Sequence, residues 1–439
     1  MKTVAIIVEY NPFHNGHLYQ INKVREETNA DCIIVIMSGN YVQRGTPAII
    51  DKYTRTKLAL LNGVDLVFEL PVYYATASAE LFAYGAVNIL NSLGIVDFLC
   101  FGSECGDIHL LEQLATILLE EPHAFQCSLK AYLKEGISFP NARKQALMDY
   151  MGYSESLSNI LNEPNNILGI EYIKALKKLN STIRPITLLR HGSGYHDKTM
   201  NHPFCSATAL RNYYEALAEN NDYLKEYEES LSTKIDRKQL SIDTFVPSTT
   251  KELLEDSYKK TFPITVDDFS SLLYYQLMHE TSDSLLEYLD MNEDLANRII
   301  NEINYHCNFS SFIDHVKTKQ FTYTRISRTL LHILLQIKKN DMNQFLNTSD
   351  GSYARLLGFK TSASKFIKDI KTKGLIPVIT KVADAHQILN PIAMQCFQKD
   401  IHATHLYNQI VFSKYHTVLP NEFVAGPVII KVNTNSCID

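Results

Sequence analysis

The chain has 439 residues, 45% of them hydrophobic, and a formal net charge of −6, so it can form two or three domains with substantial cores. This mildly acidic balance argues against a protein that coats nucleic acid without selectivity. No apolar run approaches the ~20 residues that span a bilayer, and the first residues are a strand-like run without the features of a signal peptide. We therefore expect a cytoplasmic protein that does not enter a membrane.

The eight cysteines are scattered singly along the chain. They form no C-x-x-C pair, and no histidine lies at a spacing that would suit zinc. We expect them to be reduced thiols, which agrees with a cytoplasmic location, and we predict no metal ligands on the protein.

The first part of the chain alternates short apolar runs with helical patterns. The apolar runs predict strands at residues 4–8, 32–37, 66–70, 98–102 and 183–189, and the helical patterns predict helices at 17–28, 51–61, 78–92 and 165–178. Short strands separated by helices indicate a parallel sheet with right-handed crossovers. We predict a doubly wound, Rossmann-like α/β domain over residues 1–215.

Strand-like runs become rare after about residue 215. Apolar residues at helical spacing predict helices at 270–288, 296–305 and 328–337, with a βαβ-like remnant near 375–381 and a last strand at 423–432. We predict a mainly α-helical domain over residues 216–439. Its charge is uneven, because residues 317–373 contain twelve lysines and arginines but only three acids.

The first predicted strand leads directly into Glu9-Tyr10-Asn11-Pro12-Phe13-His14-Asn15-Gly16-His17 and then into a helix. At such a junction free backbone N–H groups and the positive end of the helix dipole face one point, which favours a phosphate. His14 and His17 can donate to phosphoryl oxygens, and Gly16 has no side chain to keep a base or ribose off the backbone. H-x-G-H in a loop is weak evidence alone, but its place between strand and helix indicates a nucleotide-binding, adenylyl-transferring site.

A second group of polar residues precedes the helical half. Ser206 can cap a helix, Thr208 lies in its first turn, and Arg211 extends a charged fork from the same end. Seen alone, this is an ordinary helix cap with a solvated arginine. Together with the first motif, it predicts a second helix terminus that binds phosphate.

These two motifs resemble the nucleotidyltransferase superfamily that carries H-x-G-H and a later S-x-T-x-x-R. Four longer peptides are similar to those of the tRNA(Met) cytidine acetate ligases, namely VEYNPFHNGH at 8–17, MSGNYVQRG at 37–45, FGSE at 101–104 and PNNILGIEY at 164–172. They cover most of the first 215 residues. In the second half, the similarity rests mainly on TRISR at 324–328.

The resemblance implies a two-step reaction. ATP and acetate would give acetyladenylate and pyrophosphate, and the acetyl group would pass to N4 of the wobble cytidine (C34) of elongator tRNA(Met), giving N4-acetylcytidine. His14, His17 and Arg211 would be catalytic, with Mg²⁺ held by the phosphates. ATP would be bound by Ile7, Val8, Glu9, Tyr10, Asn11, Pro12, Phe13, His14, Asn15, Gly16, His17, Leu18, Gly102, Asn165, Arg190, His191, Ser206 and Thr208.

Two further regions are assigned to the other substrates. Residues 38–51 would lie at the acetate or cytidine end of the site, because Gln43-Arg44-Gly45 is too polar for a core, although Asp51 and Lys52 equally fit a helix cap and a surface charge. In the second half, basic residues would bind RNA phosphates, and Tyr323 or Tyr353 could stack on loop bases. The RNA-binding residues that we predict are Arg325, Arg328, Lys365, Lys368 and Lys371.

Two alternatives remain open at this stage. A small-molecule adenylyltransferase or amide ligase of the same superfamily would have no need of the basic segment. A non-catalytic protein that binds RNA or senses nucleotides would bind ATP without releasing pyrophosphate. The sequence gives no prediction of the oligomeric state.

Overall fold

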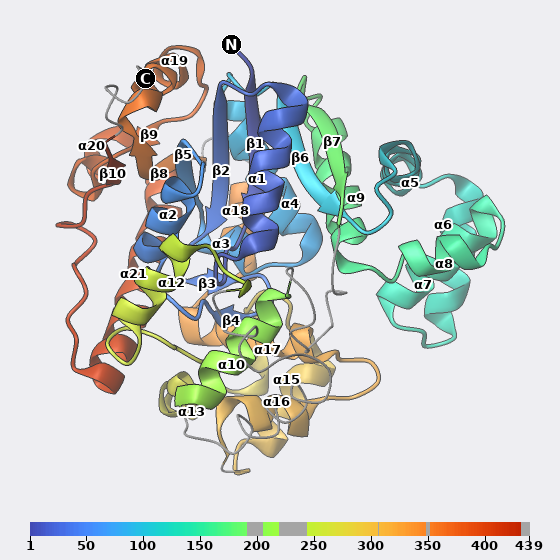
Figure 1. The fold of residues 1–439 in the computed structure, drawn as a ribbon. Coiled ribbons are helices and arrows are strands. Elements are labelled where there is room, and N and C mark those ends of the chain that lie inside the picture. The colour runs from blue at the N-terminus through green and yellow to red at the C-terminus, as the bar shows by residue number, and fades with distance from the viewer. Residues whose placement is uncertain (191–204, 219–243, 306, 348–351, 432–439) are drawn as a thin grey trace, which may run out of the picture.

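The computed structural model describes residues 1–190, 205–218, 244–305, 307–347 and 352–431 (Figure 1). An eight-stranded sheet lies at its centre, in the order β10-β8-β5-β2-β1-β6-β7, with β9 paired to β8. The predicted parallel strands of the first half are all present. They are β1 (Thr3–Val8), β2 (Cys32–Ser38), β5 (Leu66–Leu70), β6 (Phe98–Ser103) and β7 (Arg184–Leu189).

Helices cover both faces of this sheet, which confirms the doubly wound α/β fold. Because successive side chains of a strand point to opposite faces, Val4 and Ile6 of β1 pack in one core while Ala5 packs in the other. Helices α1 (Asn15–Thr28) and α2 (Lys52–Leu61) lie on the first side. The second side carries α3 (Val72–Ala75), α4 (Ala79–Ser92), α5 (Ile108–Glu120) and α9 (Pro164–Lys178).

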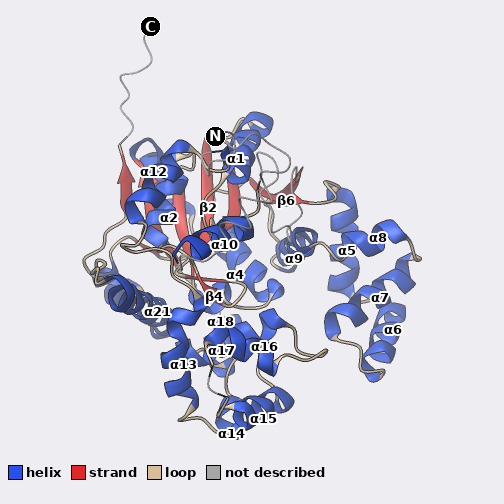
Figure 2. Ribbon diagram, turned by 60° about the horizontal axis from the view of Figure 1, so that its bottom comes forward, coloured by secondary structure: helices blue, strands red, loops and turns tan. Residues whose placement is uncertain are grey.

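Between α5 and α9 the chain forms a helical outgrowth at one side of the sheet (Figures 1 and 2). It consists of α6 (His123–Lys134), α7 (Phe139–Met151) and α8 (Glu155–Ile160). A short hairpin of β3 (Tyr41–Val42) and β4 (Thr46–Pro47) follows β2, and α10 (Ala207–Ala218) follows β7 along the chain.

The second half is mainly helical, as predicted, and many of its helices gather beyond the carboxyl ends of the parallel strands (Figure 2). No helix within the described ranges is both long and apolar enough to cross a bilayer. The helical segments are α12 (Ser248–Ser257), η2 (Val266–Phe269), α13 (Ser270–Leu277), α14 (Ser282–Leu285), α15 (Glu293–Glu302), α16 (Phe309–Val316), α17 (Tyr323–Leu335), α18 (Lys339–Asn347), η4 (Thr361–Ala363), α19 (Ser364–Lys373), η5 (Val382–Asp384), α20 (Ala385–Ile388) and α21 (Pro391–Tyr415).

Three strands from the second half complete the same sheet. β8 (Ala354–Lys360) pairs with β5 in the antiparallel direction, and β9 (Val378–Ile379) and β10 (Val428–Ile430) run parallel to β8. β9 lies where a βαβ-like remnant was expected and β10 lies within the predicted last strand, whereas β8 was not predicted. The sheet is therefore mainly parallel and takes strands from both sides of residue 215, and the domain boundary there stays a prediction.

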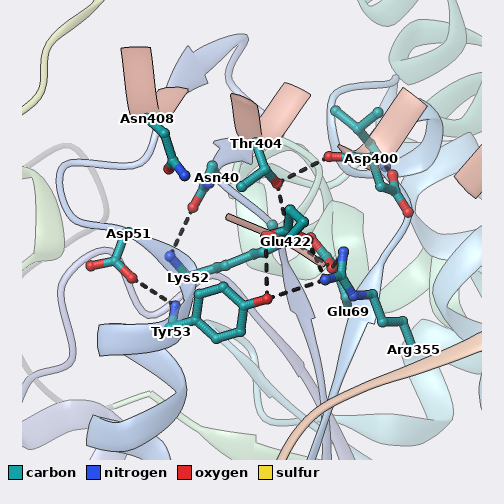
Figure 3. Close-up of polar contacts among 12 residues, drawn as sticks. Asn40, Asp51, Lys52, Tyr53, Glu69, Arg355, Asp400, Thr404, Asn408 and Glu422 are labelled. Atoms are coloured by element: carbon teal, nitrogen blue, oxygen red, sulfur yellow. Dashed lines mark hydrogen bonds and ion pairs between the residues drawn. The ribbon is translucent and has the colours of Figure 1, made fainter. Parts of the chain in front are cut away.

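Four buried charges join the second half to the sheet, and we call them the ion cluster (Figure 3). The Lys52 ammonium lies 2.8 Å from Glu69 Oε1 and 3.3 Å from Glu422 Oε2. Arg355 pairs with the same two carboxylates, at 3.1 Å from Glu69 Oε2. Since burying one charge alone costs several kcal/mol, each of these ions depends on its partners.

The ion cluster corrects one expectation. Asp51 is the N-cap of α2, accepting from the backbone N–H groups of Tyr53 and Thr54 at 2.9 and 3.0 Å. Lys52, however, is fully buried and is no surface charge. Its neutralisation comes partly from Glu422, which is distant in sequence and gives no local signal.

Candidate active site

A pocket of about 1180 Å³, open to solvent, lies where the strand order reverses between β1 and β6. This is the place where open α/β sheets bind ligands. Its walls come from the end of β1, the start of α1, the β3–β4 hairpin, the end of β6, and helices α4, α9 and α10. The predicted residues that line it are Ile7, Val8, Glu9, Tyr10, Asn11, His14, His17, Gly102, Asn165, Arg190, Ser206, Thr208 and Arg211.

The two histidines are held by the backbone at the start of α1. His14 is the N-cap, and its Nδ1 accepts the Gly16 N–H at 3.1 Å. His17 Nδ1 accepts the backbone N–H of His14 at 3.2 Å, and the two rings stack with centroids 3.7 Å apart. A Cβ on Gly16 would lie 2.9 Å from His14 Cε1, so a side chain there would displace the imidazole.

Their surroundings keep both imidazoles neutral. Burial, helped by Arg190 and Arg211, lowers the pKa of His14 to about 3. Burial, His14 and Arg190 lower the pKa of His17 well below its ordinary value. A neutral imidazole whose Nδ1 accepts a hydrogen bond carries its proton on Nε2. We therefore assign both histidines as Nε2–H donors.

The start of α10 supplies the second group of donors. Ser206 Oγ accepts the Ala209 N–H at 3.1 Å, which confirms Ser206 as a helix cap. The Arg211 guanidinium donates to the backbone oxygen of Asn11 at 2.8 Å and to Thr208 Oγ1 at 3.0 Å. Two helix N-termini thus meet at the pocket, an arrangement that suits a polyphosphate.

The charge of the residues that line the pocket also favours a polyphosphate ligand. Among the described residues that line the pocket, three arginines accompany a single carboxylate, that of Glu9. The arginines are Arg44, Arg190 and Arg211. A site with this excess of cations favours a ligand with several negative charges.

Glu104 positions the side of the pocket formed by β6 and α9. Its carboxylate accepts Asn165 Nδ2 at 2.5 Å and the Asn166 N–H at 3.0 Å. Gly102 lies close to Arg190, because a Cβ on the glycine would be 3.1 Å from the arginine Cγ. His191, also predicted to bind ATP, lies outside the described residues.

Five predicted residues do not line this pocket. Pro12 and Phe13 are buried, and Leu18 packs against the apolar core. Asn15 donates through its backbone and side-chain nitrogens to the oxygens of Phe245 and Thr244, at 3.0 and 2.7 Å. Gly16 lines an adjoining cavity of about 590 Å³.

The apolar wall of the pocket was missed by the sequence analysis. Phe82, Phe101, Leu168 and Tyr172 line it alongside the predicted polar residues. Leu168 and Tyr172 follow Asn165 by three and seven residues, a spacing that places them on one helical face. That spacing, read with the Phe101-Gly102 pair, was the available signal.

The β3–β4 hairpin closes the pocket at the expected acetate or cytidine end. Gln43 lines the pocket, and its backbone N–H donates to Glu9 Oε1 at 2.9 Å. Ser327 Oγ on α17 donates to the Gly45 oxygen at 2.9 Å. Gly45 has φ +80°, and a Cβ on it would lie 2.3 Å from the backbone nitrogen of Arg328. The second half of the chain thus fixes one wall of the pocket.

The predicted RNA-binding residues fall into two groups. Arg328 on α17 pairs with Asp290 at 2.9 Å, and Arg325 donates to the Asp290 backbone oxygen at 3.3 Å. The other group is exposed on α19, at the edge of the sheet where the parallel strands begin, opposite the pocket (Figure 1). Its members are Lys365, Lys368 and Lys371.

The two tyrosines named as stacking candidates differ in exposure. Tyr353 is only 1% exposed and donates to Asp400, so it cannot stack on an RNA base, and that expectation is wrong. Tyr323, at the start of α17, is half-buried. Its predicted role stays open.

Comparison with protein families matches residues 1–420 to the HIGH Nucleotidyl Transferase family. A tRNA(Met) cytidine acetate ligase of Thermoanaerobacter sp. (strain X514) is 42% identical over 409 residues, covering 93% of this chain and 95% of that protein. One of Caldicellulosiruptor saccharolyticus is 41% identical over 431 residues, covering 98% and 99%.

Solved structures give the same result. The crystal structure of apo Thermotoga maritima TmcAL is similar with a TM-score of 0.88 and 32% identity, covering 98% of this chain and all of that one. The same protein bound with alpha-thio ATP gives a TM-score of 0.86 at the same identity and coverage. The similarity thus covers both halves of the chain.

Proposed function

The chain belongs to the tRNA(Met) cytidine acetate ligase family of HIGH nucleotidyltransferases, and we propose that its pocket performs both steps of that ligation. Acetate and ATP form acetyladenylate and pyrophosphate, and the acetyl group passes to N4 of the wobble cytidine, C34, of elongator tRNA(Met). The observation that carries the proposal is the meeting of two neutral imidazole donors and the Arg211 helix terminus in one cation-rich pocket.

In the first step, a carboxylate oxygen of acetate bonds to the α-phosphorus, and the bond to the pyrophosphate oxygen breaks. Negative charge grows on the phosphoryl oxygens, where the Nε2–H groups of His14 and His17 donate to it. Arg211 and the α10 terminus at Ser206 and Thr208 hold the leaving pyrophosphate. Fixed donors in a shielded site stabilise such charge more than water does. No side-chain nucleophile is needed.

The nucleotide occupies the side of the pocket formed by Gly102, Asn165 and Arg190, next to the carboxyl ends of β1 and β6. Mg²⁺ supplies charge neutralisation on the phosphate oxygens when it is bound. The described residues contain no group of three or more histidine, cysteine or acidic side chains arranged to hold a metal. The phosphates themselves are therefore the proposed ligands of the ion.

The tRNA is proposed to approach from the hairpin side, where α17 with Arg325 and Arg328 supports the pocket wall. The exposed lysines of α19 would contact phosphates farther along the RNA. An anticodon cytidine lies in a loop, so presenting its base costs little unstacking energy. Counterion release from these contacts would make the affinity fall with salt.

To test the proposal, the purified protein is incubated with labelled acetate, ATP and elongator tRNA(Met), and the nucleosides of the tRNA are then analysed by mass spectrometry. We expect N4-acetylcytidine at C34 and pyrophosphate release, both dependent on ATP. Product formed equally well without ATP would overturn the adenylate route. Acetyladenylate formed in the presence of tRNA that stays unmodified would instead favour a small-molecule acceptor, and ATP binding without pyrophosphate release would favour a nucleotide sensor.

A further inference from the structure

We propose that the Glu9 carboxylate accepts the proton that cytidine N4 loses during acetyl transfer. The inference rests on the proposed function, in which N4 forms a bond to the acetyl carbon and the bond from that carbon to the AMP oxygen breaks. AMP leaves as an anion, and the nitrogen must give up one proton to become a neutral amide. A base within the pocket has to take it.

The histidines cannot serve as that base. Both imidazoles are neutral with the proton on Nε2, and their Nδ1 atoms already accept backbone N–H groups. The arginines of the lining stay protonated at every physiological pH. Glu9 is the one carboxylate among the described residues that line the pocket, and so the one strong proton acceptor there.

The orientation of Glu9 suits this role. Its Oε1 accepts the Gln43 N–H at 2.9 Å, which anchors the carboxylate to the hairpin. Within the described part of the chain, Glu9 Oε2 has no hydrogen-bond partner, and the side chain is only half-buried. One oxygen therefore fixes the group while the other is available to the acceptor amine.

The location of Glu9 suits an acceptor that enters from the hairpin side. Its carboxylate is anchored to the β3–β4 hairpin, whereas Arg190 and Asn165, which are assigned to the nucleotide, stand at the end of β7 and the start of α9. The pocket lining also includes the rings of Phe82 and Phe101 with Leu168 and Tyr172, apolar surfaces against which a flat base can pack.

The informative variant is Glu9→Gln, because the amide oxygen still accepts the Gln43 N–H but no longer takes a proton. Acetate-dependent exchange of labelled pyrophosphate into ATP measures the first step, and single-turnover acetylation of tRNA measures the second. We expect acetyl transfer to slow by about 10²- to 10⁴-fold with unchanged KM for tRNA, and the exchange reaction to slow far less, so that the ratio of transfer to exchange falls. Glu9→Asp, which keeps a carboxylate, should restore part of the transfer rate.

Glu104→Gln is the matched control, because this carboxylate supports Asn165 on the nucleotide side and should affect the exchange reaction as well. Equal losses of exchange and transfer in Glu9→Gln would overturn the proposal, as would an unchanged transfer rate. If that variant does not fold, the wild-type transfer must still slow in D₂O, and a transfer rate that is the same in D₂O and H₂O would count against Glu9. Wild-type protein that makes no N4-acetylcytidine would contradict the proposed function itself.

Discussion

The pocket and the ion cluster both lie toward the carboxyl ends of the parallel strands, yet they handle charge in opposite ways. In the ion cluster, two cations meet two carboxylates, and all four are almost completely buried. The pocket lining has three arginines and one carboxylate. Charge that is balanced inside the protein holds the chain together, whereas an excess of one sign prepares a site for a charged ligand.

The pKa values of buried groups in the two regions are shifted by opposite balances of burial and charge. In the ion cluster, Lys52 and Arg355 overcome the effect of burial and lower the pKa of Glu422, so the carboxylate stays ionised. In the pocket, burial acts on His14 with neighbouring cations in the same direction, and the imidazole stays neutral. The pocket therefore presents neutral imidazole donors beside the permanent charge of its arginines.

The largest effect is expected where the balance of the ion cluster is broken. Lys52→Met leaves Glu69 and Glu422 with only Arg355, and removing one partner of a buried ion pair costs about 3–5 kcal/mol. Urea unfolding should show this loss. Lys23→Met is the control, because Lys23 pairs with Glu26 on an exposed helix face, where water screens the pair and its loss should change unfolding little. Equal small losses would show that the ion cluster does not stabilise the fold.

The next effect concerns the donors of the pocket. His17→Ala removes an Nε2–H from the growing phosphoryl charge, so acetyladenylate formation should slow by about 10²- to 10³-fold. His17→Gln keeps an acceptor for the His14 N–H, as an N3 glutamine does in a capping box. It should therefore retain stability but not the full rate. Pyrophosphate exchange measures the loss of rate, and thermal unfolding measures the loss of stability. An unchanged exchange rate in His17→Ala would show that His17 is not catalytic.

A smaller, pH-dependent effect is expected at Asp400, next to the ion cluster. Burial raises its pKa to about 7, while its oxygens accept from Val72 N–H and the Tyr353 hydroxyl. Because the folded state holds this proton more tightly than the unfolded state, the stabilisation is present at pH 4 and is lost as pH rises through 7. Asp400→Asn should thus gain about 1–3 kcal/mol relative to wild type between pH 5 and pH 8. A pH-independent difference in urea unfolding would contradict this.

The smallest effect is expected far from the pocket, on α19. Reversing Lys365, Lys368 and Lys371 to glutamate should weaken tRNA binding about tenfold and reduce the slope of log affinity against log salt by up to about three. Pyrophosphate exchange should not change. The exposed Lys130 and Lys134 of α6, reversed in the same way, serve as the control. If the α19 variant binds tRNA like wild type, α19 is not part of the RNA interface.

Much of the first half could be predicted because its signals are local. The run at 66–70 predicts β5, which the structure places at Leu66–Leu70, and the histidines were found because a strand, a turn and a helix start follow one another. β8 was missed because its apolar run at 356–359 is short and is bounded by Arg355 and Lys360. Arg355 is acceptable in a buried strand only beside Glu69 and Glu422, which no local pattern reveals.

The candidate site divides in the same way. Polar residues at helix starts, such as Ser206 and Arg211, stand out in the sequence. The apolar wall does not, because Phe82 and Phe101 have the same pattern as core residues of α4 and β6. Contacts between the hairpin and α17 also depend on segments far apart in the chain. Long-range packing, and not local propensity, decides these features.

The late position of Glu422 and β10 has a consequence for synthesis on the ribosome. Lys52 and Glu69 leave the exit tunnel hundreds of residues before Glu422 does. During that time the nascent sheet lacks β10 and the Glu422 carboxylate. A polypeptide that ends before residue 422 would lack β10 and expose β8. It would also leave Lys52 and Arg355 with Glu69 as their only carboxylate in the ion cluster. Cellular proteases would therefore remove such truncated products, and only a nearly full-length translation product would persist.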